Sequence, residues 1–307
     1  MGLLKLINMG WMKIVALLKL CNTPATIYSP FPLFAISLFL LSRKELSIYD
    51  LPIMFAGIVV SWLLAFPSNL WNHCNDLKED KAAGKKTILT QDASMQKKAV
   101  FIAVLLYACS MLFVYYLSNE FKRPIYLYTL VWIIFTWWYS DNLILKKVIG
   151  FRLKDHYLGE LFAYSISMPM YTLSVWLVYT DLNLKGVIIT VAVFFFSISA
   201  LLLKDLKDIS GDKKAGLKTF GVVFLPSQLV RYSSYLMVLY YLVLLNLFTL
   251  NPGILIITIP FIYFLKNTFI HMYKKNWTLE LGDFPALKGI GNSIYASFIF
   301  MGLSPLF

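Results

Sequence analysis

The chain has 307 residues, of which 59% are hydrophobic and only 14% are charged, and its formal net charge is +12. Soluble domains carry about 25% charged residues, so this composition excludes a water-soluble protein and predicts a chain that lies in a membrane. The positive charge fits lysines retained in cytoplasmic loops, and we expect no nucleic-acid partner.

Nine stretches of the sequence approach the length of about 20 mostly apolar residues that a helix needs to cross a bilayer. In chain order they are 25–42, 51–71, 98–118, 124–141, 158–180, 185–203, 231–250, 252–268 and 287–306. No linker or low-complexity tract divides them. We therefore predict an all-α integral membrane protein, with about nine transmembrane helices in one bundle and a single transmembrane domain over 1–307.

The loops between these spans differ in charge on the two sides of the membrane. If the N-terminus is inside, few of the 28 Lys and Arg residues fall in outside loops, namely Arg43, Lys44, Lys122, Arg123 and Lys185. Because positive residues are retained on the cytoplasmic side, the asymmetry predicts a cytoplasmic N-terminus and an external C-terminus. The long polar loops after the second, fourth and sixth spans are then cytoplasmic, and we expect the function there.

The loop after the second span contains the first acidic segment, residues 72–87, with the sequence NHCNDLKEDKAAGKKT. Asn72, Asp76 and Asp80 are spaced at i, i+4 and i+8, so a helix presents them on one face. Carboxylate and amide oxygens on one face form a hard oxygen cluster of the kind that Mg²⁺ prefers.

The loop after the sixth span contains the second acidic segment, residues 204–219, with the sequence KDLKDISGDKKAGLKT. Asp205, Asp208 and Asp212 again share one helical face. Both spans end on the same side, so the two clusters can meet and hold two or three Mg²⁺ ions together with substrate phosphates. Lysines are interleaved with both clusters, at Lys78, Lys81, Lys85, Lys86, Lys207, Lys213 and Lys214. These cations predict a substrate more negative than metal ions alone can neutralise, and a diphosphate has that property.

Together the motifs resemble the signatures of the UbiA superfamily of intramembrane prenyltransferases. The spacing N-x₃-D-x₃-D in the first acidic segment is similar to the family's first signature, and D-x₂-D-x₃-D followed by G-x-K-T in the second is similar to its second signature. Tyr139-Ser140 followed by Arg152-Leu153-Lys154 resembles the family's YS…RLK block. The resemblance covers nearly the whole chain, because nine helices with active loops after the second, fourth and sixth are the family's layout.

Two positions of the first acidic segment depart from the family's pattern. His73 stands where many relatives carry Asp, and Lys86 stands where Arg is frequent. Arg and Lys are not equivalent at phosphate sites, because only the guanidinium offers a bidentate fork.

The resemblance implies Mg²⁺-dependent transfer of a polyprenyl group from its diphosphate, for example geranylgeranyl diphosphate, to a lipophilic acceptor with an aromatic ring or a hydroxyl. It implies Mg²⁺ ligands at Asn72, Asp76, Asp80, Asp208 and Asp212. Lys86, Arg152 and Lys154 are then expected to bind the diphosphate as its bond to carbon breaks.

The resemblance also implies how the remaining steps occur. The allylic fragment is cationic, and Tyr139 is expected to stabilise it through its ring. Asp76 or Asp205 is expected to orient the acceptor or take its proton, and the residues do not distinguish between these two. A site within the membrane keeps water from quenching the cation.

Other functions remain open at this point. A polytopic ion or solute transporter that uses the acidic clusters as a cation site is the main alternative, since acidic residues in membrane helices often mark ion paths. Here, however, the acids gather at helix ends on one side. A CDP-alcohol phosphotransferase would need a single D-x₂-D-G-x₂-A-R block, which the sequence lacks. A purely structural membrane protein would not need two matched acidic clusters.

Overall fold

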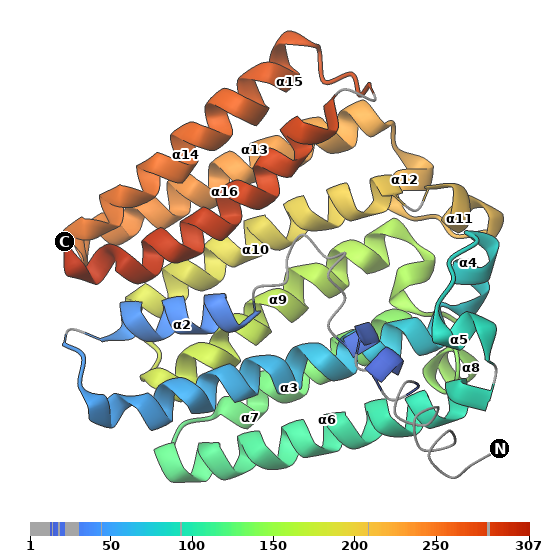
Figure 1. Cartoon of the computed structure of the whole chain (residues 1–307), viewed down its shortest axis with the longest axis horizontal. Coiled ribbons are helices and arrows are strands. Elements are labelled where there is room, and N and C mark those ends of the chain that lie inside the picture. The colour runs from blue at the N-terminus through green and yellow to red at the C-terminus, as the bar shows by residue number, and fades with distance from the viewer. Residues whose placement is uncertain are drawn as a thin grey trace, which may run out of the picture.

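The structure is a computed structural model that describes residues 13, 15–17, 19–21, 31–43, 45–92, 94–207, 209–280 and 283–307. Over these residues the chain forms helices joined by short loops, and a single β-bridge pairs His156 with Lys218. The predicted all-α class is therefore confirmed. Figure 1 shows the long helices running side by side, with short helices gathered at one end of the bundle, which we call the short-helix end.

The apolar stretches of the sequence form the long helices. These are α2 (Phe31–Ser42), α3 (Leu51–Asn75), α6 (Ser94–Phe121), α7 (Ile125–Ser140), α9 (Tyr157–Tyr179), α10 (Leu184–Lys204), α13 (Pro226–Leu245) and α16 (Phe284–Leu303). Between α13 and α16 the helix is irregular, because η5 (Pro252–Ile257) leads into α14 (Thr258–Phe264), a π-helical turn (Leu265–Phe269) and α15 (Ile270–Lys274).

Six of the described helices are long and apolar enough to cross a membrane, and α2 and α7 are shorter apolar helices. The chain is thus an integral membrane protein with several membrane-spanning helices. That nine helices cross, and that the N-terminus and the acidic segments are cytoplasmic, stay predictions. Residues 25–30 of the first predicted span lie outside the described residues.

Helix α3 continues to Asn75, beyond the predicted end of the span at residue 71. The reason is polar rather than apolar: the Asn75 side chain donates to the carbonyl of Trp71 at 2.9 Å, and the Asn75 carbonyl accepts from the side chain of Asn142 at 2.8 Å. A helix end needs partners for its free backbone groups, and here side chains and a neighbouring loop supply them. The extra turn carries Asn72 on a regular helix.

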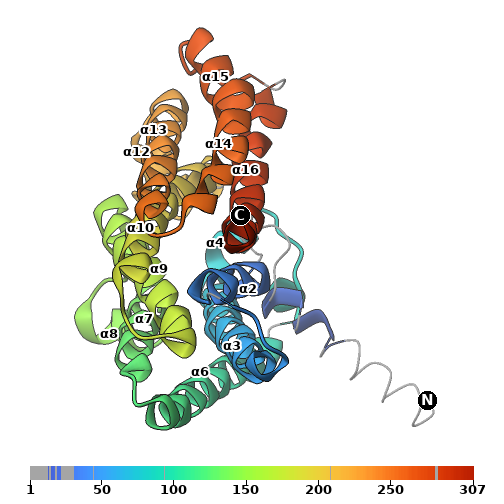
Figure 2. The same cartoon turned by 90° about the vertical axis from the view of Figure 1, so that its left-hand side faces the viewer.

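The long helices close into a ring, which Figure 2 shows nearly end on. Around it, α6 packs on α7, α7 on α9, α9 on α10 and α10 on α13, and η5 and α14 connect α13 to α16. The ring returns from α16 through α2 and α3 to α6. Large apolar side chains such as Phe101, Leu112 and Ile262 are exposed on its outside, as expected of a surface that faces lipid.

The short helices lie where the long ones end. They are α4 (Leu77–Ala82), α5 (Ile88–Gln91), α8 (Leu145–Ile149), α11 (Ile209–Lys214) and α12 (Phe220–Val223), with 3₁₀ turns η2 (Leu153–Asp155) and η3 (Asp205–Lys207). Because α4 follows α3 and α11 follows α10, both acidic segments lie at the short-helix end (Figure 1).

Candidate active site

One pocket at the short-helix end is lined by residues of both acidic segments. It encloses about 430 Å³, part of which is open to solvent. Its lining residues are Asn72, His73, Asp76, Glu79, Asp80, Ala83, Lys85, Lys154, Lys204, Gly211 and Asp212. The expected Mg²⁺ ligands Asn72, Asp76, Asp80 and Asp212 thus share one pocket, and the remaining one, Asp208, lies outside the described residues.

A glycine lets the second acidic segment approach the first. A Cβ at Gly211 would lie 3.1 Å from the Cβ of Ala83, which is tighter than an ordinary carbon–carbon contact. Gly211 is in α11 and Ala83 directly follows α4, so the missing side chain allows these two short helices to pack directly. This packing brings Asp212 to the pocket that Asp76 and Asp80 line.

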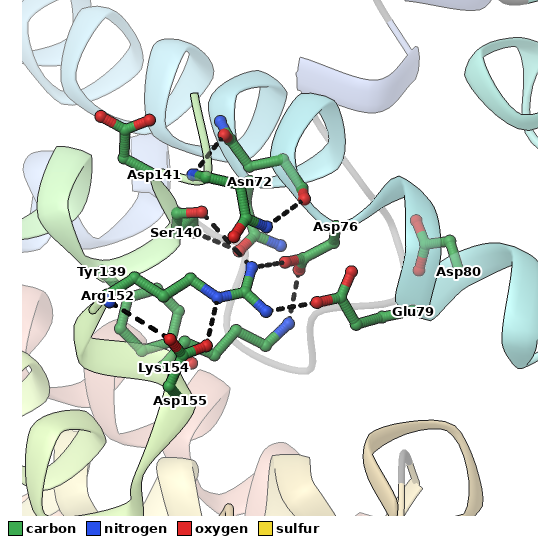
Figure 3. A network of polar contacts seen from close by, with 12 residues as sticks. Asn72, Asp76, Glu79, Asp80, Tyr139, Ser140, Asp141, Arg152, Lys154 and Asp155 are labelled. Carbon is green, nitrogen blue, oxygen red and sulfur yellow. Dashed lines mark hydrogen bonds and ion pairs between the residues drawn. The ribbon is translucent and has the colours of Figure 1, made fainter. Parts of the chain in front are cut away.

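Arg152 is the centre of the ion-pair network in Figure 3. It is 1% exposed, and its guanidinium donates to Asp76 at 3.1 Å, to Asp155 at 2.8 Å and to Glu79. Burial works against the charged form, but Asp76 and Glu79 raise the pKa of Arg152 above its ordinary value, so the group is a permanent cation. Arg152 therefore holds the wall of the pocket from behind and does not line it.

Lys154 reaches the pocket from the loop before α9. Its ammonium donates to the second carboxylate oxygen of Asp76 at 2.5 Å. Two backbone bonds tie this loop to the second acidic segment: the N–H of Lys218 donates to the carbonyl of Asp155 at 3.1 Å, and the N–H of Tyr157 donates to that of Lys218 at 2.8 Å. The loop before α9, which contains Arg152 and Lys154, thus contacts both acidic segments.

Asp80 has a cation and an imidazole as partners. The ammonium of Lys85 lies 3.1 Å from one carboxylate oxygen, and Nδ1 of His73 lies 3.6 Å from the other. Burial raises the pKa of Asp80, but His73 and Lys85 together lower it below the ordinary value. Asp80 is therefore a carboxylate, and His73 belongs to the site through this contact.

Asp212 has a weaker partner. Its carboxylate accepts from the hydroxyl of Thr219 at 2.9 Å. Burial raises the pKa of Asp212, and the charge of Lys154 and the Thr219 hydroxyl lower it only in part, so the balance stays above the ordinary value. A cation bound beside Asp212 would favour its ionised form.

Tyr139 and Asp205 both contact Lys204, which lines the pocket. The hydroxyl of Tyr139 donates to the carboxylate of Glu160 at 2.9 Å and accepts from Lys204 at 2.7 Å. The ammonium of Lys204 also lies 3.9 Å from the carboxylate of Asp205. Neither Tyr139 nor Asp205 lines the pocket, whereas Lys204, at the end of α10, does.

The three lysines that line the pocket are Lys85, Lys154 and Lys204. Lys86, the expected diphosphate ligand of the first segment, is exposed and is not part of the lining. Its role in diphosphate binding stays a prediction, and Lys85 is placed closer to the acidic residues.

Sequence reasoning did not assign Glu79, Glu160 or Lys204 to the site, although each carried a signal. Glu79 is three residues after Asp76, so it lies near the same helical face. Glu160 is an ionisable residue in an apolar span, and such residues are usually functional or paired. Lys204 precedes the first Asp of the second segment, and only the fold shows that its side chain turns toward Tyr139.

The oxygen donors of the pocket fit Mg²⁺. No group of three His, Cys, Asp or Glu side chains in the described part of the chain is close enough to hold a metal ion unaided. Mg²⁺ is commonly bound through one or two carboxylates, with water and substrate phosphates as its other ligands. In addition, the buried Oε2 atom of Glu79 has no hydrogen-bond partner among the described residues. A pocket with acidic oxygens and three ammonium groups is suited to a metal-bound polyanion.

The chain is similar to known proteins both in sequence and in structure. The family model for the UbiA prenyltransferase family matches residues 29–278. An uncharacterised protein of Archaeoglobus fulgidus is 30% identical over 284 residues, which cover 90% of this chain and 93% of that protein.

Solved structures share the fold. A UbiA homologue from Archaeoglobus fulgidus bound to GPP and Mg²⁺ has a TM-score of 0.67 at 17% identity, over 95% of this chain and 99% of that chain. A structure reported for digeranylgeranylglyceryl phosphate synthase has a TM-score of 0.65 at 15% identity, over 96% and 99%. With a matching family model over most of its length and a relative at 30% identity, this chain belongs to the UbiA prenyltransferase family.

Proposed function

We propose that the protein transfers a polyprenyl group from its diphosphate to a lipophilic acceptor, with Mg²⁺, at the pocket between the two acidic segments. One observation carries this proposal. Four of the expected Mg²⁺ ligands line a single pocket together with Lys85, Lys154 and Lys204, although they come from segments more than a hundred residues apart. Acidic and basic groups in one pocket suit a metal-bound diphosphate better than they suit a bare cation.

The bound metal would neutralise the diphosphate as a leaving group. We propose two or three Mg²⁺ ions, and their proposed ligands are Asn72, Asp76, Asp80, Asp208 and Asp212. Structures of a UbiA homologue bound to Mg²⁺ with GPP or with DMAPP support the pairing of Mg²⁺ with a prenyl diphosphate.

The basic residues contribute to the same step in different ways. When the bond between the allylic carbon and oxygen breaks, its electron pair leaves with the diphosphate, and negative charge grows there. Lys154 lines the pocket and meets this charge directly, and we assign Lys86 to the outer side of the diphosphate. Arg152 holds Asp76 and Glu79 in place, so it acts on the diphosphate through the pocket wall.

The allylic fragment carries the positive charge that remains. We assign its stabilisation to the ring of Tyr139, at the end of α7, because an aromatic face attracts a cation. The acceptor forms the new bond with its electron pair and loses a proton, for which Asp76 and Asp205 are the candidates. The reaction would take place in the membrane, with geranylgeranyl diphosphate as a suitable donor.

Calorimetric titration tests the proposal. We would titrate the purified full chain in detergent with geranylgeranyl diphosphate, first with Mg²⁺ and then with EDTA, beside an Asp76→Ala, Asp212→Ala double variant. Micromolar binding that requires both Mg²⁺ and the aspartates is expected. Binding absent in folded protein under all conditions would contradict the proposal and favour a transporter that uses the acidic clusters for another ligand.

A further inference from the structure

Lys204 occupies a position between two parts of the site. It is the last residue of α10, its side chain is 30% exposed, and it lines the pocket that Asp76, Asp80 and Asp212 share. Yet its shortest contact is outside the lining, where it donates to the hydroxyl of Tyr139 at 2.7 Å. A single side chain therefore touches both the pocket and the ring assigned to the allylic cation.

The ammonium of Lys204 lies in an aromatic and acidic cage. Its nitrogen is 5.2 Å from the ring centroid of Tyr139 and 5.6 Å from that of Tyr164, within the range of cation–π attraction. The two rings meet edge to face, with centroids 5.7 Å apart. We call the set Tyr139, Tyr164, Glu160 and Asp205 the Lys204 cage.

The acidic side of the cage consists of two carboxyl groups that interact with each other, those of Glu160 and Asp205. Both residues are buried, and each has one carboxyl oxygen that no N–H or O–H group of the other described residues reaches. The ammonium of Lys204 lies 3.9 Å from Oε1 of Glu160 and 3.9 Å from Oδ1 of Asp205. Of these two oxygens, only Oε1 of Glu160 also accepts from the hydroxyl of Tyr139. A cage of this kind attracts positive charge in general and is not specific for an ammonium group.

Lys204 is also the pocket lysine with the loosest carboxylate contact. Lys154 lies 2.5 Å from Asp76, and Lys85 lies 3.1 Å from Asp80, whereas Lys204 is 3.9 Å from its carboxylates. A lysine has a flexible four-carbon stem and acts as a point charge, so its ammonium can reach different partners from one backbone position. A diphosphate in the pocket would offer it stronger charge-assisted bonds than a neutral phenol does.

We propose that Lys204 is a mobile diphosphate ligand: its ammonium leaves the cage for the diphosphate when the substrate binds, and the rings of Tyr139 and Tyr164 then become free for the allylic group. This inference rests on the proposed function. It links binding of the leaving group to exposure of the aromatic faces, so the cation would form only where those faces are free to stabilise it.

Inorganic diphosphate is the probe that tests this movement, because it carries no allylic group that could contact Tyr139. We would measure its affinity by calorimetry with Mg²⁺, using the full chain and the variants Lys204→Met, Lys204→Arg and Tyr139→Phe. Thermal unfolding establishes that each is folded. Lys147→Met is the matched control, because Lys147 is exposed on α8 and does not line the pocket.

Lys204→Met is expected to weaken binding about tenfold, the loss expected for one charge-assisted bond. Lys204→Arg should retain most of the affinity, and the control Lys147→Met should retain all of it. Tyr139→Phe removes the competing hydroxyl, so it should tighten binding about threefold. In the Lys204→Met background, Tyr139→Phe should have no effect, because no ammonium remains to be released.

Two results would overturn the inference alone. They are unchanged affinity in Lys204→Met, or a Tyr139→Phe effect that is absent or equal in both backgrounds. If the unmodified chain itself fails to bind inorganic diphosphate with Mg²⁺, the proposed function fails and this inference fails with it. If Lys204→Met does not fold, the comparison of Tyr139→Phe with the unmodified chain still decides, since unchanged affinity there contradicts the competition.

Discussion

The two acidic segments end in the same turn but provide different surroundings for their last aspartate. After α4, Gly84 has φ of 70° and the N–H of Lys85 donates to the carbonyl of Asp80 at 2.9 Å. After α11, Gly216 has φ of 76°, and the residue that follows it donates in the same way to Asp212, at 3.0 Å. This left-handed conformation favours glycine and reverses the chain toward the helix it has just left.

The residue after the glycine makes the difference. In the first segment it is Lys85, whose ammonium then reaches Asp80, whereas in the second it is Leu217, which is buried. Asp212 instead accepts a hydrogen bond from the hydroxyl of Thr219. The pKa of Asp80 is accordingly lowered and that of Asp212 is raised, so Asp80 is kept ionised by the protein, whereas a bound cation would favour the ionised form of Asp212.

The largest effect is expected at Arg152, which pairs with Asp76 and Glu79 of the first acidic segment. Arg152→Met would leave Asp76, Glu79 and Asp155 without their shared buried cation and should cost about 3 to 5 kcal/mol of stability. Arg152→Lys should lose less, because it keeps the charge but not the fork. Unfolding in detergent measures both, and equal stability of Arg152→Met and the unmodified chain would contradict the network.

Substitutions in the two segments should have similar effects on activity but different effects on stability. Asp76→Asn and Asp212→Asn are each expected to reduce transfer roughly 100-fold, because each removes a proposed metal ligand. Only Asp76→Asn should also lower stability, by about 2 kcal/mol, since it removes the carboxylate that Lys154 contacts and one of the three that Arg152 contacts. Steady-state rates and unfolding curves of the two variants test this. Equal losses of stability would remove the distinction between the segments.

Exchanging one lysine should make the first segment resemble the second. Lys85→Leu places after Gly84 the residue type that position 217 has, so Asp80 loses its cation. About 1 kcal/mol of binding should be lost, and the KM for the prenyl diphosphate should rise several-fold. Lys86→Leu is the matched neighbour and should have a smaller effect, since Lys86 is exposed outside the pocket. A larger effect at Lys86 would restore it as the principal lysine of this segment.

The smallest effect is a pH dependence of opposite sign at the two aspartates, measured with EDTA. The lowered pKa of Asp80 gives stability that is fully present above the pKa of the unfolded chain and is lost as pH falls through the folded value. The raised pKa of Asp212 gives a penalty that grows as pH rises from the unfolded value through the folded one.

Asn substitutions isolate these contributions. As pH rises, the stability of Asp212→Asn should increase relative to that of the unmodified chain, whereas the stability of Asp80→Asn should decrease relative to it. Unfolding free energies across the acid range check both signs. The same sign at both positions would mean that Lys85 and His73 do not distinguish Asp80 from Asp212.

Local patterns in the sequence account for much of the fold and part of the site. Long apolar stretches predict the helices, because burial in lipid leaves few alternatives to a helix. The spacing of Asn72, Asp76 and Asp80 predicts a common face, and all three line one pocket. The spacing of residues does not predict which basic side chain pairs with which acidic side chain.

That pairing depends on how the chain turns after each short helix. Lys85 and Lys86 are equivalent in the sequence, and only the left-handed Gly84 directs the first of them back toward Asp80. Similarly, Arg152 was expected to bind the diphosphate, but its loop pairs with Lys218 and places the guanidinium behind Asp76. Contacts of this kind join distant parts of the chain, and a local pattern cannot specify them.

A double-variant cycle on diphosphate binding tests most directly whether the two acidic segments act on one ligand. We would measure the affinity for geranylgeranyl diphosphate with Mg²⁺ in Asp76→Asn, in Asp212→Asn and in the double variant. If both aspartates serve one metal-bound diphosphate, their effects are not additive, and the coupling exceeds about 0.5 kcal/mol. Additive losses would mean that the segments bind separately, and the single shared site would be contradicted.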